Sequence, residues 1–211
     1  MTNSKRSDIT ILLDRSGSMA TVKSDVEGGF ERFLADQRAI PGECALSLVQ
    51  FDSLAIDQVY TEQPILTAPA LSLHPRGNTP LLDAVGHTIV RTGERLAAKP
   101  EAARPGRVLF VIITDGKENA SQEYTKARVR QLVEQQTQTY KWQFLYLGAN
   151  VDAFAEAGGL GISQQFAASF VASPMGAQHC MELASFKVAE FRRGAGVAFS
   201  EEEREKLGGR S

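Results

Sequence analysis

A short apolar run that ends in an acidic, hydroxyl-rich loop decides the fold of this chain: Ile9-Thr10-Ile11-Leu12-Leu13-Asp14-Arg15-Ser16-Gly17-Ser18. The run is branched and apolar on both faces, as is typical of a central strand in a sheet that helices cover on both sides. Asp14 closes the run, and Gly17 allows the following loop to bend sharply. We therefore predict a buried strand whose carboxyl end carries one carboxylate and two hydroxyl groups.

Strand-like and helix-like segments alternate along the rest of the chain, and no repeat interrupts them. The expected strands are 9–13, 44–51, 56–60, 107–113, 142–148 and 165–170. The expected helices begin at a capping box on Ser24, at Thr79-Pro80, at Ser121, at Asp152 and at Ser173, and the last one reaches about Arg193. The turn Asp52-Ser53 predicts that 56–60 pairs as an antiparallel edge strand.

This alternation predicts the fold class: α/β, a doubly wound, mostly parallel six-stranded sheet with one antiparallel edge strand and helices on both faces. The strands 9–13 and 107–113 should be central neighbours, because the chain reverses its direction of winding between them. Ligands of such sheets bind where the carboxyl ends of the strands meet this switch point. Asp14 and Asp115 lie at the ends of these two strands, so we expect both carboxylates at that point.

The predicted domain covers residues 7–193, and residues 194–211 are expected to form a C-terminal tail. The segment Ser200-Glu201-Glu202-Glu203 has the pattern of a capping box, which predicts a short surface helix within the tail. Gly194 and Gly196 make the junction between domain and tail compliant.

Composition and charge restrict the class of protein. The 211 residues include 23 Lys and Arg against 25 Asp and Glu, and this net charge of −2 argues against electrostatic attachment to nucleic acid or to an anionic membrane. Two cysteines, Cys44 and Cys180, are too few for a disulfide framework or a four-thiolate zinc site. The apolar run 9–13 is too short for a signal peptide or a membrane span, so we expect a cytoplasmic protein.

Five oxygen-bearing side chains are the candidate ligands of a metal ion: Asp14, Ser16, Ser18, Thr79 and Asp115. Alternate side chains of the first loop can converge, a threonine adds a hydroxyl at a helix start, and the second aspartate adds a carboxylate after a strand. Hard oxygen ligands of this kind suit Mg²⁺ or Mn²⁺ rather than zinc, and octahedral Mg²⁺ needs about six of them, water included.

The motif Asp14-x-Ser16-x-Ser18, the loop residue Thr79 and the strand end Thr114-Asp115-Gly116 resemble the von Willebrand factor type A family and its metal-ion-dependent adhesion site. The resemblance covers the order and spacing of elements over residues 7–193, as in stand-alone intracellular bacterial members. It implies that the two serines, and often the threonine, touch the metal, whereas the two aspartates bind it directly or through water. The tail lies outside the family pattern.

The resemblance implies a non-enzymatic, divalent-metal-dependent module that binds a partner protein through an Asp or Glu of that partner. Two carboxylates and three neutral hydroxyls, some of them acting through water, leave the cation incompletely neutralised, so an acidic side chain can replace a water at an open coordination position. Neither nucleic acid, nor membrane, nor a small-molecule substrate is expected as a partner.

The alternative is an enzyme. A strand that ends in Asp also begins the Mg-dependent phosphatases of the haloacid dehalogenase type, in which Asp14 would be the nucleophile. Those enzymes use a second carboxylate two residues later as the general acid. This chain has Ser16 there, and a serine cannot perform that proton transfer at neutral pH.

Overall fold

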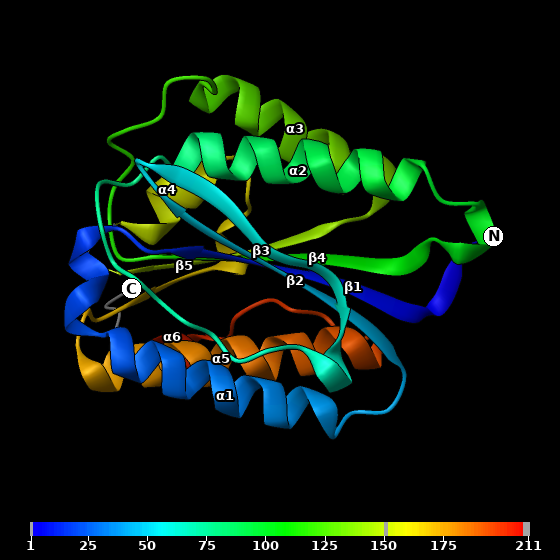
Figure 1. Cartoon of the computed structure of the whole chain (residues 1–211), viewed down its shortest axis with the longest axis horizontal. Helices are drawn as coiled ribbons and strands as arrows, with labels where there is room; N and C mark the ends of the chain where they lie inside the picture. Colours follow the sequence, from blue (N-terminus) through cyan, green and yellow to red (C-terminus); the bar gives the residue numbers. More distant parts are fainter. Residues whose placement is uncertain (1, 150–151, 209–211) are drawn as a thin grey trace.

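A six-stranded sheet runs through the middle of the molecule, between two layers of helices (Figure 1). The computed structural model describes residues 2–149 and 152–208, and its strand order is β3-β2-β1-β4-β5-β6. The strands are β1 (Asn3–Asp14), β2 (Glu43–Asp52), β3 (Ala55–Pro64), β4 (Pro105–Thr114), β5 (Gln143–Ala149) and β6 (Ala167–Phe170). The edge strand β3 is antiparallel to β2, and the other paired strands are parallel. The predicted fold class is therefore confirmed.

The helices divide the core into two layers (Figure 1). On one face lie α1 (Lys23–Arg38), α5 (Pro174–Arg193) and α6 (Glu201–Lys206), and on the other lie α2 (Leu81–Ala97), α3 (Lys126–Tyr140) and α4 (Ala153–Gly159). Successive side chains of a strand point to opposite faces, so Ile11 packs in the layer of α1 and α5 whereas Leu12 packs in the layer of α2 and α3. This burial on both faces explains why the run at 9–13 is apolar except for Thr10.

The strands β1 and β4 are central neighbours, as predicted. Leu13 pairs with Ile113, so the two strands end at the same level and at the same edge of the sheet. The chain then builds outward on one side through β2 and β3, and on the other side through β5 and β6. The switch point between these two directions lies where Asp14 ends β1 and Asp115 follows β4.

The predicted start of the first helix is wrong. The helix α1 begins at Lys23 with Val22 as its N-cap, so Ser24 lies inside the first turn instead of capping it. A 3-10 turn at Gly17–Thr21 leads directly into α1 and leaves no free helix end for Ser24 to cap. Glu27, the expected second member of the capping box, accepts a hydrogen bond from the backbone N–H of Leu73.

The starts of α2 and α3 were also predicted incorrectly. The N-cap of α2 is Pro80 rather than Thr79, and the N-cap of α3 is Thr125 rather than Ser121. The hydroxyl of Ser121 accepts from the backbone N–H of Asp83, so it serves the start of the facing helix α2. A loop distant in sequence thus replaces the local cap of α2, whereas α3 is capped locally by Thr125, whose hydroxyl accepts from the backbone N–H of Arg128. The helices α4 and α5 begin where predicted, with Asp152 and Ser173 as their N-caps.

The tail packs against the domain from Gly194 to Gly208, and residues 209–211 lie outside the described residues. Ser200 forms the predicted capping box at the start of α6. Three apolar side chains of the tail are buried in the core layer of α1 and α5: Val197, Phe199 and Leu207. The tail also reaches the edge of the sheet, because Gly208 forms an antiparallel bridge with Phe170 of β6.

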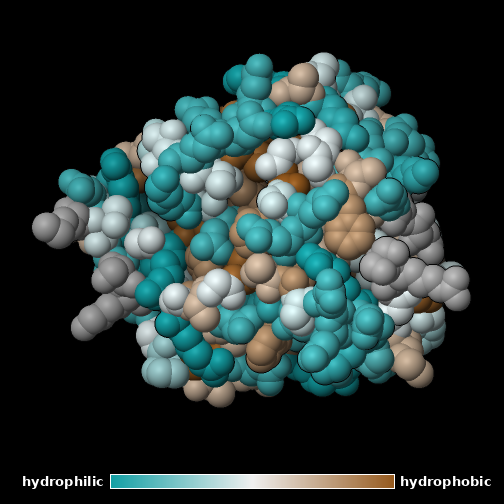
Figure 2. Space-filling model, turned by 180° about the vertical axis from the view of Figure 1, so that it is seen from behind, coloured by the Kyte–Doolittle hydropathy of each residue, from teal (hydrophilic) through white to brown (hydrophobic). Residues whose placement is uncertain are grey.

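The surface seen from behind is mostly hydrophilic, with apolar side chains in scattered patches (Figure 2). Among the described residues, no helix is both long enough and apolar enough to cross a membrane. The two cysteines, Cys44 and Cys180, are buried and free.

Candidate metal centre

The first candidate ligand, Asp14, is fully buried at the end of β1. Its Oδ1 accepts a hydrogen bond of 2.7 Å from the backbone N–H of Ser16, which turns the loop back toward the carboxylate. Its Oδ2 accepts a hydrogen bond of 2.6 Å from the hydroxyl of Thr114, at the end of β4. The carboxylate is therefore held between the two central strands.

Hydroxyl groups connect the first loop to the second carboxylate. The Oγ atoms of Ser16 and Ser18 are 3.1 Å apart, and Ser18 Oγ donates a hydrogen bond of 2.7 Å to Asp115 Oδ1. Ser16 and Asp115 are buried, whereas Ser18 is exposed. The structure thus joins four of the five predicted ligands into one cluster that opens to solvent at Ser18.

The fifth predicted ligand, Thr79, borders the cluster next to Gly116. A Cβ built on Gly116 would lie 3.0 Å from Thr79 Oγ1 and 3.9 Å from Asp14 Oδ2, so both oxygens face the same small space. Among the described residues, no hydrogen bond joins the Thr79 hydroxyl to the other four predicted ligands.

Asn119, which was not predicted from the sequence, holds Thr79 in this place. The backbone N–H of Thr79 donates to Asn119 Oδ1 at 2.9 Å, and the backbone N–H of Asn119 donates to Thr79 O at 3.1 Å. The neighbouring Glu118 accepts from the backbone N–H of Leu82 in the first turn of α2. The sequence feature that could have indicated this role is the polar pair Glu118-Asn119, which follows shortly after Asp115 in the loop that leaves the switch point.

The two carboxylates of the cluster lack a positive partner among the described residues. Burial raises the pKa of Asp14 to about 6, although hydrogen bonds from Thr114 and Ser16 oppose the shift, and the nearby charge of Asp115 adds to it. Burial also raises the pKa of Asp115, against a hydrogen bond from Ser18. Both carboxylates are thus costly to ionise unless a cation accompanies them.

The ligand set fits a hard divalent cation. Two carboxylates and three hydroxyls supply oxygen atoms only, which suits Mg²⁺ or Mn²⁺ and not zinc. The oxygen–oxygen distances of 2.7 and 3.1 Å lie close to the edge of about 3.0 Å that an octahedron with Mg–O bonds of about 2.1 Å requires. Within the described part of the chain, no three His, Cys, Asp or Glu side chains are grouped to hold a metal, so hydroxyls would complete this site.

Sequence comparison gives no relatives for this chain. No protein-family model matches it, and no curated protein sequence matches it.

Solved structures with the same fold do match. One is the von Willebrand factor type A structure from Catenulispora acidiphila, with 15% identity, a TM-score of 0.56, and coverage of 88% of this chain and 43% of that one. A second is the vWF domain of the type V pili tip protein Mfa5 from Porphyromonas gingivalis, with 10% identity, a TM-score of 0.58, and coverage of 95% and 100%. A third is the pilus adhesin SpaC from Lactobacillus rhamnosus GG, with 13% identity, a TM-score of 0.64, and coverage of 90% and 31%.

The chain spans less than half of the Catenulispora and SpaC chains, and also less than half of the mussel byssus protein PTMP1, to which it is similar as well. At this level of identity the likeness shows the fold alone. The chain has the fold of von Willebrand factor type A domains.

Proposed function

We propose that this chain is a non-enzymatic protein-binding module that holds Mg²⁺ or Mn²⁺ with Asp14, Ser16, Ser18, Thr79 and Asp115. The observation that supports this best is the hydrogen-bonded series from Ser16 through Ser18 to Asp115, which lies at the switch point and is exposed at its middle member, Ser18. A bound cation would supply a Lewis acid with a coordination position open to a ligand from outside.

In this proposal the aspartates and the hydroxyl residues have different roles. The two aspartates supply two negative charges, which balance the charge of the cation, and the three hydroxyls supply neutral oxygens, so the cation acts toward a partner as a Lewis acid with an open coordination position. A carboxylate of a partner protein then replaces water at the exposed side, next to Ser18. Two of the similar structures are a domain of a pilus tip protein and a pilus adhesin, which supports a role in contact between proteins.

Thermal unfolding with and without Mg²⁺ or Mn²⁺ tests the metal site. A cation that binds only the folded state raises the melting temperature. At a concentration of one hundred times its Kd, it increases the free energy of unfolding by about 2.7 kcal/mol. Asp14→Ala is expected to fold and to lose this rise. The exposed Glu31 provides the matched control, since Glu31→Ala removes a carboxylate away from the site and should keep the rise. Equal stabilisation of the wild type and Asp14→Ala would contradict the site.

Peptide binding tests the partner. Immobilised Asp- and Glu-containing peptides should retain the Mg²⁺-loaded protein, their Asn and Gln counterparts should not, and EDTA or Asp115→Ala should abolish retention. Retention that is unchanged in EDTA would show that another surface binds. Turnover of a generic phosphomonoester that Asp14→Ala abolishes would instead support the phosphatase alternative.

A further inference from the structure

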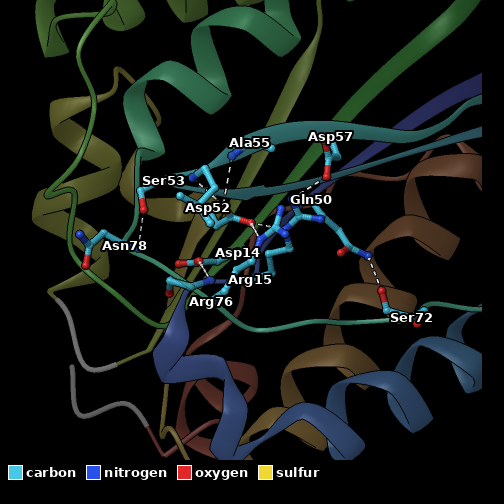
Figure 3. A network of polar contacts seen from close by, with 12 residues as sticks. Asp14, Arg15, Gln50, Asp52, Ser53, Ala55, Asp57, Ser72, Arg76 and Asn78 are labelled. Atoms are coloured by element: carbon cyan, nitrogen blue, oxygen red, sulfur yellow. Dashed lines mark hydrogen bonds and ion pairs between the residues drawn. The ribbon is translucent and has the colours of Figure 1, made fainter.

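The side chain of Arg15 leaves the candidate metal loop and reaches the β2–β3 hairpin (Figure 3). Arg15 lies between Asp14 and Ser16 in the chain, and its side chain is almost fully buried. Its Nε donates to Asp52 Oδ2, and its Nη2 donates to Asp57 Oδ2 at 2.6 Å. One guanidinium thus spans two carboxylates that are 37 and 42 residues away in the sequence.

Asp52 is the centre of this network. Its buried carboxylate receives two side-chain hydrogen bonds on Oδ2, from Arg15 and from Arg76 Nε, the latter at 3.0 Å. Its Oδ1 accepts from the backbone N–H groups of Leu54 at 2.6 Å and Ala55 at 3.1 Å. Burial raises the pKa of Asp52, but the hydrogen bonds from Arg15 and Arg76 outweigh it and lower the pKa overall. Asp52 therefore stays an anion beside the guanidinium groups.

Backbone hydrogen bonds join the same three loops: 14–18, 52–55 and 76–79. They run from Arg76 N to Arg15 O (2.9 Å), from Gly17 N to Gly77 O (3.1 Å) and from Ser53 N to Asn78 O (3.0 Å). Ser53 Oγ also accepts from Asn78 N at 2.9 Å, as Figure 3 shows. The loop 76–79 carries Thr79, and the loop 14–18 carries three other candidate ligands. The hydrogen bonds around Asp52 therefore hold two ligand-bearing loops together.

We propose that Arg15 and Asp52 are positioning residues whose buried ion pair holds the loop 14–18 in its metal-binding arrangement before a metal binds. The inference rests on the proposed metal site. Ordering a loop costs conformational entropy, and a loop that is ordered on folding does not incur that cost again when the cation binds. The pair also neutralises a guanidinium that would otherwise repel a cation held by the adjacent residues.

The test measures Mn²⁺ affinity by electron paramagnetic resonance, and loop order by amide hydrogen exchange of residues 14–18 in EDTA. Asp52→Asn and Arg15→Met are expected to weaken Mn²⁺ binding by about tenfold or more, as for other residues that orient metal ligands, and to speed exchange of the loop. Asp52→Asn should have the larger effect, because it also leaves Arg15 without its buried counter-charge. Asp57→Asn is the matched control: Asp57 is half exposed, and its loss should change affinity by less than about twofold.

The double variant separates a pair from two independent effects. Arg15→Met combined with Asp52→Asn should bind Mn²⁺ no more weakly than Asp52→Asn alone, since the interaction is already lost. If Arg15→Met does not fold, Arg15→Lys keeps the charge but reaches only one of the two carboxylates, and should give intermediate affinity.

Folded variants with wild-type affinity and wild-type exchange would overturn the inference, and so would affinity losses that simply multiply in the double variant. A wild type that binds no Mn²⁺ would instead overturn the proposed function. In that case the exchange in EDTA still decides whether the pair orders the loop, because that readout needs no metal.

Discussion

The hydroxyl of Thr114, at the end of β4, donates a hydrogen bond of 2.6 Å to Asp14 Oδ2, at the end of β1. This bond ties the two central strands together where the candidate metal centre begins. The partner of this buried carboxylate is therefore a neutral hydroxyl and not a positive charge. A neutral hydrogen bond does not offset the cost of removing the charged carboxylate from water. Burial consequently raises the pKa of Asp14 to about 6.

Asp14→Asn is therefore expected to stabilise the metal-free protein near neutral pH. Because the folded-state pKa is raised, the stability contributed by protonated Asp14 is present below about pH 4 and is lost as the pH rises through about 6. Asparagine removes the ionisation and can keep the local contacts, since the Thr114 hydroxyl has a second acceptor in Gly116 O at 3.1 Å. Urea unfolding in EDTA should show a gain of about 1–3 kcal/mol at neutral pH that disappears near pH 4.

Mg²⁺ should make the wild type more stable than Asp14→Asn, because the cation stabilises the wild type and not the variant. An Asp14→Asn protein that is less stable than the wild type in EDTA at neutral pH would contradict the prediction.

Asp83→Ala should destabilise the loop that follows the second candidate carboxylate. The carboxylate of Asp83 accepts from three consecutive backbone N–H groups, those of Gln122 (2.7 Å), Glu123 (3.0 Å) and Tyr124 (2.7 Å). Their loss should lower the free energy of unfolding by about 2–4 kcal/mol, as measured by urea titration. Glu94→Ala, at an exposed position of the same helix, should stay within about 0.5 kcal/mol of the wild type.

Lys187→Met should loosen the C-terminal tail. The buried ammonium contacts Glu190 Oε2 (2.9 Å), Glu203 Oε1 (2.8 Å) and Ala198 O (2.9 Å), and so it links α5 to two points of the tail. Its removal leaves these oxygens without their donor and should cost about 1–3 kcal/mol. Limited proteolysis should cut the tail faster in this variant than in the control Lys206→Met, which removes an exposed lysine. Equal cleavage rates would show that the apolar contacts alone hold the tail.

Two adjacent glycines of α1 should respond in opposite directions to alanine. A Cβ on Gly29 would lie 2.6 Å from Met181 Cβ, whereas a Cβ on Gly28 has nothing within 4 Å. Gly28→Ala should stabilise by about 0.5–1 kcal/mol, because alanine has the higher helix propensity. Gly29→Ala should destabilise by about 1–3 kcal/mol, because it forces α1 and α5 apart. Thermal unfolding of the two variants measures the difference, and a stabilised Gly29→Ala would contradict the close packing.

Local pattern was sufficient to predict the architecture. The mostly apolar run 9–13 and the strand 107–113 indicate buried central strands, because strands that are covered on both faces show no regular polar alternation. Once these two strands are neighbours, the topology brings Asp14 and Asp115 to one edge without further information. The convergence of the two carboxylates therefore follows from periodicity and chain order.

Tertiary structure alone decided how the candidate site is held. Glu118 and Ser121 supply acceptors to the start of α2, Asn119 fixes Thr79, and Asp52 binds Arg15 across 37 residues of sequence. None of these bonds has a local signature, because a polar side chain in a loop pairs with whichever donor or acceptor the folded chain brings near it. Hydrophobic periodicity is set within a few residues, whereas burial of a polar group requires a partner from any part of the chain. The sequence of this protein thus determined its strands and their order, and only the assembled loops determined the partners of its buried charges.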